Sequence, residues 1–374
     1  MRPFALHSLT ALVGLCLLAP RAAPAQPSKP PQPTVAILSA DASTVAAQTD
    51  DEIRVWQRGS GKLLAQVKNL GSFRGSLAPG ALVAVSDEGI TVWRSKRYNR
   101  AVRLRVPKVL SMGRTSISAD GKVATAIFAH DGGVGDPDTV GVWDAESGAM
   151  RGRITLRGAR VLGAALSADG KLIAVFGDRG GSINARGRRH TPAAVLRVHS
   201  LTSKSVGPAL LRWSSIADRT TYCAAFAPGP RPLLGLCAGK RLVLWELAGV
   251  RARLVTHAGT DAIKSLFPKQ LQGPSVELPG AHGLVFSPDG KQLLTFHAYG
   301  VIGIARWSAQ PTRRAGLSLR PIAWIKRPLV GGTMRQVAWD SKGEIWLVTS
   351  GYSSKIQIHT PRRDRFAPVR VLGP

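Results

Sequence analysis

A short run of alternating apolar and polar residues that ends in an aromatic anchor returns along the chain. Alternation with a period of two is typical of a β-strand with one buried face. Five copies end in tryptophan and two end in histidine at the same position. These anchors are Trp56, Trp93, Trp143, His199, Trp245, Trp307 and His359. The regular return of one strand pattern predicts a repeat protein built from β-strands.

A tight-turn motif, Ser-x-Asp-Gly-Lys, precedes several of these strands, most clearly at residues 118–122, 167–171 and 287–291. Glycine tolerates positive φ and aspartate bonds its own backbone, so the motif predicts a hairpin. After the anchor, a second turn leads to a further alternating strand, as at residues 101–106. Each unit is therefore predicted to contain four antiparallel strands.

Seven such units share residues 34–374, roughly 49 residues each, which is near the length of a four-stranded propeller blade. The succession of turn, strand and Ser-Gly turn resembles the WD40 repeat. Residues 87–93, DEGITVW, match its strand pattern, and residues 143–144 are a true Trp-Asp pair. The Gly-His pair that opens many WD40 repeats is missing. The resemblance implies an all-β, seven-bladed β-propeller of four-stranded antiparallel blades that presents partners on its faces, and it implies no catalytic residue.

The recurring tryptophans, Trp56, Trp93, Trp143, Trp245 and Trp307, are predicted to pack between blades, because they occupy matched positions. Closing a ring of sheets leaves only short outer edges. The last unit has four strands of its own within residues 334–372. We therefore expect closure by face packing, without an N-terminal strand borrowed into the last blade.

The first 25 residues have the pattern of a secretion signal. Arg2 precedes an apolar run at residues 9–19, and a small-residue cleavage site lies near Ala25 and Gln26. Residues 26–33 form a proline-rich spacer. No later run reaches the ~18 apolar residues that a membrane helix needs. A periplasmic or secreted protein with no transmembrane span is expected.

Two cysteines remain after the signal, Cys223 and Cys237, on either side of a turn at residues 227–232. In an oxidising compartment such a pair favours a disulfide across the hairpin. Two buried free thiols are the alternative.

The chain has 51 lysines and arginines against 22 acidic residues, a formal charge of +29. Such an excess attracts anions, although a base-composition bias toward arginine also explains it. Many arginines fall in the expected outermost strands, where charge of either sign prevents edge-to-edge pairing. Because the sign is mostly positive, we predict a basic rim. Its members are Arg103, Arg105, Arg151, Arg153, Arg251, Arg253, Arg363 and Arg365.

Two long turns between second and third strands are candidate binding loops, expected on the same face as the connection at residues 257–282. Their charged residues are Asp131, Asp136 and Asp138 in one turn and Arg179, Arg186, Arg188, Arg189 and His190 in the other. Loops on a rigid scaffold often carry function. The alternative is a tolerated insertion with surface charge pairing. Calcium could bind the three aspartates, but their spacing does not match an EF-hand.

No G-x-S-x-G, H-E-x-x-H, P-loop or dinucleotide motif occurs in the chain. The sequence therefore favours a monomeric, non-enzymatic scaffold without a cofactor. Its partner would be a protein or an anionic polymer or surface of the cell envelope, with no specific nucleic acid. The alternative is a propeller hydrolase or lactonase with a metal in its central channel, which convergent carboxylate, Asn or His groups would indicate.

Overall fold

The computed structural model describes eighteen segments of the chain, and all of its strands lie in the second of two compact units, Gln32–Pro374. The described segments are residues 35–49, 52–68, 75–86, 89–94, 97–106, 111–129, 139–179, 193–215, 221–229, 233–238, 241–248, 251–258, 281–297, 302–312, 316–327, 332–351, 355–362 and 365–372.

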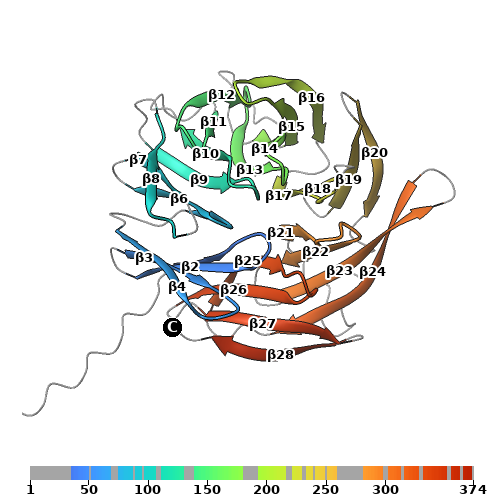
Figure 1. The fold of residues 1–374 in the computed structure, drawn as a ribbon. Helices are drawn as coiled ribbons and strands as arrows, with labels where there is room; N and C mark the ends of the chain where they lie inside the picture. Colours follow the sequence, from blue (N-terminus) through green and yellow to red (C-terminus); the bar gives the residue numbers. More distant parts are fainter. Residues whose placement is uncertain are drawn as a thin grey trace, which may run out of the picture. The chain divides into compact units, whose positions relative to one another are not determined.

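All regular structure in these segments is β-strand, arranged as seven four-stranded antiparallel sheets (Figure 1). We number the sheets in chain order. Within each sheet the strands pair in chain order too, as a succession of hairpins. This is the four-strand unit that the repeat predicted.

The first four sheets take their strands from the blue to green part of the chain (Figure 1). Sheet 1 contains β1 (Val35–Leu38), β2 (Thr44–Thr49), β3 (Glu52–Gln57) and β4 (Leu63–Lys68). Sheet 2 contains β5 (Ser76–Ala78), β6 (Ala81–Ser86), β7 (Gly89–Arg94) and β8 (Arg100–Arg103). Sheet 3 contains β9 (Ser111–Ile117), β10 (Val123–Ala129), β11 (Thr139–Asp144) and β12 (Met150–Thr155). Sheet 4 contains β13 (Arg160–Leu166), β14 (Leu172–Arg179), β15 (Ala193–Leu201) and β16 (Val206–Ser215).

The last three sheets are also built from consecutive strands, and among the described residues sheet 7 contains no strand from the N-terminal region. Sheet 5 contains β17 (Thr221–Phe226), β18 (Leu233–Ala238), β19 (Arg241–Ala248) and β20 (Arg251–Ala258). Sheet 6 contains β21 (Ala281–Phe286), β22 (Gln292–His297), β23 (Ile302–Thr312) and β24 (Gly316–Arg327). Sheet 7 contains β25 (Gly332–Trp339), β26 (Ile345–Gly351), β27 (Lys355–Arg362) and β28 (Arg365–Leu372).

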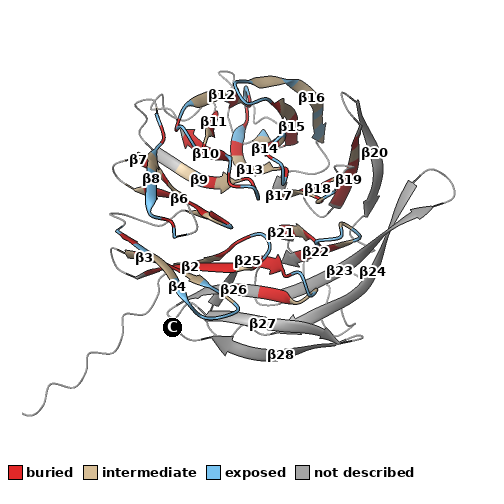
Figure 2. Ribbon diagram, in the orientation of Figure 1, coloured by how far each residue is buried: buried red, intermediate tan, exposed pale blue. Residues whose placement is uncertain are grey.

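In sheets 1 to 4 the fourth strand is less buried than the second and third strands (Figure 2). In β6, five of six residues are buried, whereas β8 has no buried residue. A strand buried on both faces needs a partner on each side, and an outer strand meets solvent. Each sheet therefore covers its neighbours through its inner strands.

Apolar clusters join successive sheets. Sheets 1 and 2 share one cluster, sheets 2 and 3 a second, sheets 3 and 4 a third, and sheets 4 and 5 a fourth. Gly235 of sheet 5 lies against Leu284 of sheet 6, and the indole N–H of Trp339 in sheet 7 donates to Val285 O of sheet 6 at 3.4 Å. Consecutive units of the repeat are thus packed neighbours.

Sheet 7 also contacts sheet 1, the blue and red parts that lie side by side in Figure 1. The Gln336 amide accepts the Leu38 N–H at 2.7 Å and donates to Leu38 O at 2.7 Å. Trp346 packs in one cluster with Ala36 and Leu38. Buried polar groups are satisfied here by a side chain rather than by a strand partner.

The Ser-x-Asp-Gly-Lys motif forms the hairpin that it predicted. Ser118 Oγ donates to Asp120 Oδ1 at 2.6 Å and accepts the Val123 N–H at 3.0 Å. Gly121 closes the turn with φ of 71°, a conformation that favours glycine. Equivalent bonds hold the turns of Ser39, Ser167 and Ser287.

The outer strand of sheet 2 differs from the expected span of residues 101–106, because β8 ends at Arg103. The reason is a contact with sheet 3. Arg105 N–H donates to Gly148 O at 3.2 Å, and the indole N–H of Trp143 donates to Arg105 O at 3.0 Å. At Arg105 the backbone therefore bonds to sheet 3 and no longer to its own sheet.

Cys223 lies directly opposite Cys237 in the β17–β18 pairing, and the two form a disulfide. Both residues are buried. Among the described residues, no helix has the length and apolarity needed to cross a membrane.

Candidate functional site

The anchor tryptophans are packing residues wherever their side chains are described. Trp143 and Trp245 are buried, and each packs against side chains of the preceding sheet. Trp56 and Trp93 are partly buried against equivalent clusters. The rings of Trp143 and Trp245 are therefore not available for stacking on a ligand. The side chain of Trp307 lies outside the described residues.

His199 takes the anchor position in sheet 4. Its Nδ1–H donates to Gly207 O at 3.0 Å, while Nε2 is buried with no hydrogen-bond partner among the described residues. Burial lowers its pKa, so the ring is neutral at pH 7. The described residues contain no group of three or more His, Cys, Asp or Glu placed to hold a metal ion.

The predicted rim arginines divide into two groups. Arg103, Arg105 and Arg153 are exposed. Arg151, in contrast, has a side chain only 9% exposed, because its guanidinium pairs with Asp144 at 2.6 Å and donates to Thr202 O at 3.1 Å. Arg151 thus links sheet 3 to sheet 4 and does not extend into solvent. The side chains of Arg251, Arg253, Arg363 and Arg365 lie outside the described residues.

Most charged residues of the two predicted binding loops also lie outside the described residues. They are Asp131, Asp136, Asp138, Arg186, Arg188, Arg189 and His190. Arg179 is described, exposed, and the last residue of β14. It opens onto a pocket that the sequence did not predict.

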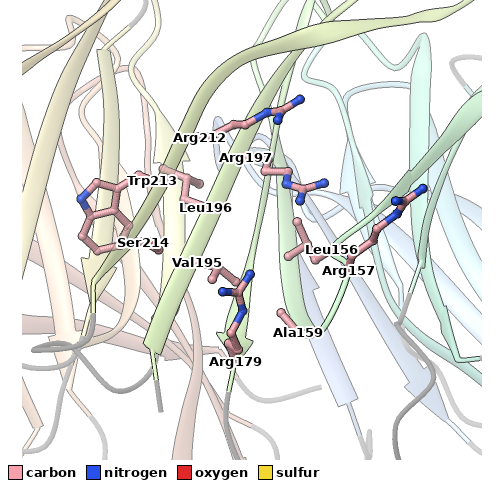
Figure 3. Close-up of a pocket in the computed structure, with 10 residues that line it drawn as sticks. All are labelled: Leu156, Arg157, Ala159, Arg179, Val195, Leu196, Arg197, Arg212, Trp213 and Ser214. Carbon is pink, nitrogen blue, oxygen red and sulfur yellow. The ribbon is translucent and has the colours of Figure 1, made fainter. Parts of the chain in front are cut away.

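This pocket has a volume of about 160 Å³ and is lined by four arginines (Figure 3). Its walls come from three strands of sheet 4 and from the connection between β12 and β13. The lining residues are Leu156, Arg157, Ala159, Arg179, Val195, Leu196, Arg197, Arg212, Trp213 and Ser214. None of these residues is acidic. The ion pairs found among the described residues involve none of the four arginines.

Two of the arginines are cross-strand neighbours. Arg197 on β15 lies directly opposite Arg212 on β16, so both side chains leave the same face of the sheet. Like charges in this position are destabilising. The Arg197 Nη1–H donates to Thr155 O of sheet 3 at 3.0 Å, which fixes the direction of the guanidinium.

The pKa of Arg197 reflects a concentration of positive charge. Burial lowers it, and the charges of Arg212, Arg179 and Arg157 lower it further. An arginine nevertheless stays protonated in proteins. The pocket is therefore a permanently cationic recess, and what it can do chemically is bind an anion.

One residue in the sequence carries a signal for this pocket. Arg197 lies two residues before its anchor, where the first copy has Arg54, which pairs with Glu52, and other copies have Thr91, Gly141 or Val243. An arginine at a partly buried strand position is unusual unless it is paired, and the ion pairs of the described residues include none with Arg197. Its neighbour Arg212 has no comparable signal, because the register of β15 with β16 shifts at two points.

No family model matches the chain, and no curated protein matches its sequence.

Proposed function

We propose that the chain is an exported, seven-bladed, WD40-like β-propeller that acts as a non-enzymatic scaffold for an anionic polymer or surface. The propeller is residues 34–374, and each sheet is one blade. Three features of the chain support this proposal: the repeat pattern, the contacts between sheets and the arginine pocket.

Two observations support the closed ring. Every sheet contacts the next one, and sheet 7 contacts sheet 1 through Gln336 and Leu38. In addition, Trp56 packs toward sheet 7 as Trp143 and Trp245 pack toward the sheets that precede them. A ring gives the first sheet the same relation to the last that every other sheet has to its predecessor.

The observation that carries the function is the pocket, where four arginines and no acidic residue are among the described lining residues. Surface charges contribute little to stability even when they are paired. Stability therefore does not explain why four unpaired arginines gather here. Arginine does bind carboxylate, sulfate and phosphate groups through its planar fork. Together with the charge of +29, the pocket supports recognition of an anionic partner.

Export is supported by the disulfide between Cys223 and Cys237. Disulfides persist in the periplasm and outside the cell and are rare in the cytosol. This agrees with the signal pattern in residues 1–25, and we propose a periplasmic or secreted location.

The test is retention on heparin resin, an acidic polysaccharide, as the salt concentration rises. Two double variants each remove two positive charges: Arg157→Gln/Arg212→Gln in the pocket and Arg105→Gln/Arg153→Gln on the rim. Each lost charge weakens the attraction to the resin, and salt screens the remaining exposed charges over about 10 Å at 0.1 M. Both variants should therefore elute at lower salt than the wild type. Unchanged elution of both variants would overturn the proposed function.

A further inference from the structure

We infer that the four-arginine pocket is a discrete site for a compact tetrahedral dianion, a phosphate that is free or the terminal group of a larger molecule. This inference rests on the proposed function, because it names the ligand that the same face would take. It adds a single, stoichiometric site to what would otherwise be diffuse attraction to a basic surface.

The size of the pocket favours a small charged group over a whole ligand. Pockets for drug-sized molecules usually have roughly 300–1,000 Å³, whereas this one has about 160 Å³. A phosphate fits this space, and an extended polymer would place only one of its charged groups inside.

The charges favour a dianion over a monoanion. Arg197 and Arg212 repel one another across adjacent strands, and Arg157 and Arg179 add two further positive charges. An anion between them replaces repulsion with attraction, and it gains twice as much from two charges as from one. A phosphate monoester carries nearly two charges above its second pKa, about 6.

One arginine, Arg197, is positioned before any ligand arrives. Arg197 uses one N–H on Thr155 O, which leaves four of its five N–H donors for an anion. Arg212 shares its face of the sheet and is exposed. Apolar side chains of Leu156, Ala159 and Val195 form the remaining wall, and such a wall strengthens charge interactions by excluding water.

The experiment is isothermal titration of the purified full chain with inorganic phosphate and with glycerol phosphate, at pH 7.5 and pH 5.0. Inorganic sulfate, which is a dianion at both pH values, is titrated in parallel. The proteins are the wild type, Arg157→Gln/Arg212→Gln, and the charge-matched control Lys62→Gln/Lys68→Gln, at two exposed lysines of sheet 1. Circular dichroism checks that each variant is folded.

We expect one phosphate per chain at pH 7.5. Hydrogen bonds to charged groups are strong enough that losing two arginines should weaken binding at least about tenfold in the pocket variant. The control should bind like the wild type. At pH 5.0 glycerol phosphate should bind about tenfold more weakly, because roughly a tenth of a phosphate monoester is dianionic there. Inorganic phosphate has a higher second pKa and should weaken more. Sulfate should bind about equally at both pH values, since arginines are the only titratable groups among the described residues that line the pocket and burial lowers the pKa of the nearby His199.

Tighter binding of glycerol phosphate would support the site and assign it to a terminal phosphate, and tighter binding of the inorganic ion would support it with free phosphate as the source. Equal weakening in both double variants would overturn the inference, because attraction would then be diffuse. Undetectable phosphate binding, together with normal heparin retention, would overturn this inference and leave the proposed function standing.

Discussion

The carboxylate of Asp340 lies 2.7 Å from Nη1 of Arg58, although 282 residues separate the two in the chain. Asp340 begins the turn after β25 in sheet 7, and Arg58 follows β3 in sheet 1. The Asp340 side chain is 1% exposed, and it also accepts the N–H groups of Lys342 and Glu344 and the indole N–H of Trp346. The Arg58 guanidinium lies 4.1 Å from the centre of the Trp346 ring, close enough for a cation–π contact.

Other sheets hold uncharged residues at these positions. Ala145 and Leu201 bond their preceding turns through backbone N–H groups as Arg58 does, but both are apolar. Ser118 begins its turn where Asp340 begins the turn of sheet 7. Burial alone would raise the pKa of Asp340, but hydrogen bonds from Arg58 and Glu344 lower it below its ordinary value. The junction of sheets 1 and 7 therefore holds a charged pair, Arg58 and Asp340, where the corresponding residues Leu201 and Ser118 are uncharged.

Replacing Arg58 by leucine should destabilise the protein by about 3 kcal/mol, because Asp340 would be left buried and unpaired. The double variant Arg58→Leu/Asp340→Ser reproduces the uncharged residues Leu201 and Ser118, so it should recover most of that loss. Urea unfolding of both variants and the wild type measures the difference. A double variant less stable than Arg58→Leu would contradict this account.

The stability of the protein should fall in acid through Asp144. Burial acts to raise its pKa, but the bonds from Arg151, Ser147 and Glu146 lower it from 3.8 to about 2. A carboxyl with a depressed folded pKa stabilises the fold above its unfolded pKa, and the contribution disappears as the pH falls through the folded value. The window is therefore pH 3.8 down to about 2.

In that window, Asp144→Asn should lose less stability than the wild type does. Unfolding free energies at pH 2, 3, 4 and 6 give the comparison, and the gap between the two proteins should close near pH 2. Glu146→Gln, at an exposed neighbouring position, is the matched control. A constant gap across the series would show that Asp144 acts through shape and not through charge.

The disulfide should contribute about 3 kcal/mol, since it closes a loop with a sequence separation of 14. The variant Cys223→Ala/Cys237→Ala removes it without leaving a buried polar group. Its urea midpoint should fall to that of the reduced wild type, and thiol titration of unfolded, unreduced wild type should find neither cysteine free. Two titratable thiols would rule out the bond.

Gly141 should not tolerate even alanine. A Cβ atom there would overlap the ring of Trp143 and lie 2.8 Å from Phe128 Cε1, and both rings are fully buried. Overpacking of this kind costs about 1–3 kcal/mol. Gly59→Ala is the control, because a Cβ at Gly59 meets nothing within 4 Å, and its thermal midpoint should stay near that of the wild type. Equal midpoints for the two variants would refute the packing argument.

The repeat could be predicted from the sequence because its turn motif and its anchor residue both have local physical causes. The turn at Ser118 needs only residues within five positions, and the burial of Trp143 follows from a strand with one apolar face. The pocket could not be predicted from the sequence, because it depends on which residues of neighbouring strands and sheets lie opposite each other. Only the β15–β16 register brings Arg212 to Arg197, and only packing between sheets brings Arg157 to both.

The rim prediction is wrong in part for the same reason. An arginine on or beside an outer strand is expected to face solvent, and Arg105 and Arg153 are exposed. Arg151 lies in the same strand as Arg153, yet it reaches Asp144 in its own sheet and Thr202 in the next one. A long side chain can cover that distance, and the alternation of a strand does not reveal the partner.

The bonds between Gln336 and Leu38 join residues 298 positions apart, which has a consequence for how the chain matures. Contacts of such long sequence separation form late and slow folding. Synthesis delivers β1 long before β25, so the apolar side chains of Ala36 and Leu38 stay uncovered until the last sheet has formed. A nascent chain that stalls before residue 332 would keep these side chains open to aggregation and to chaperones.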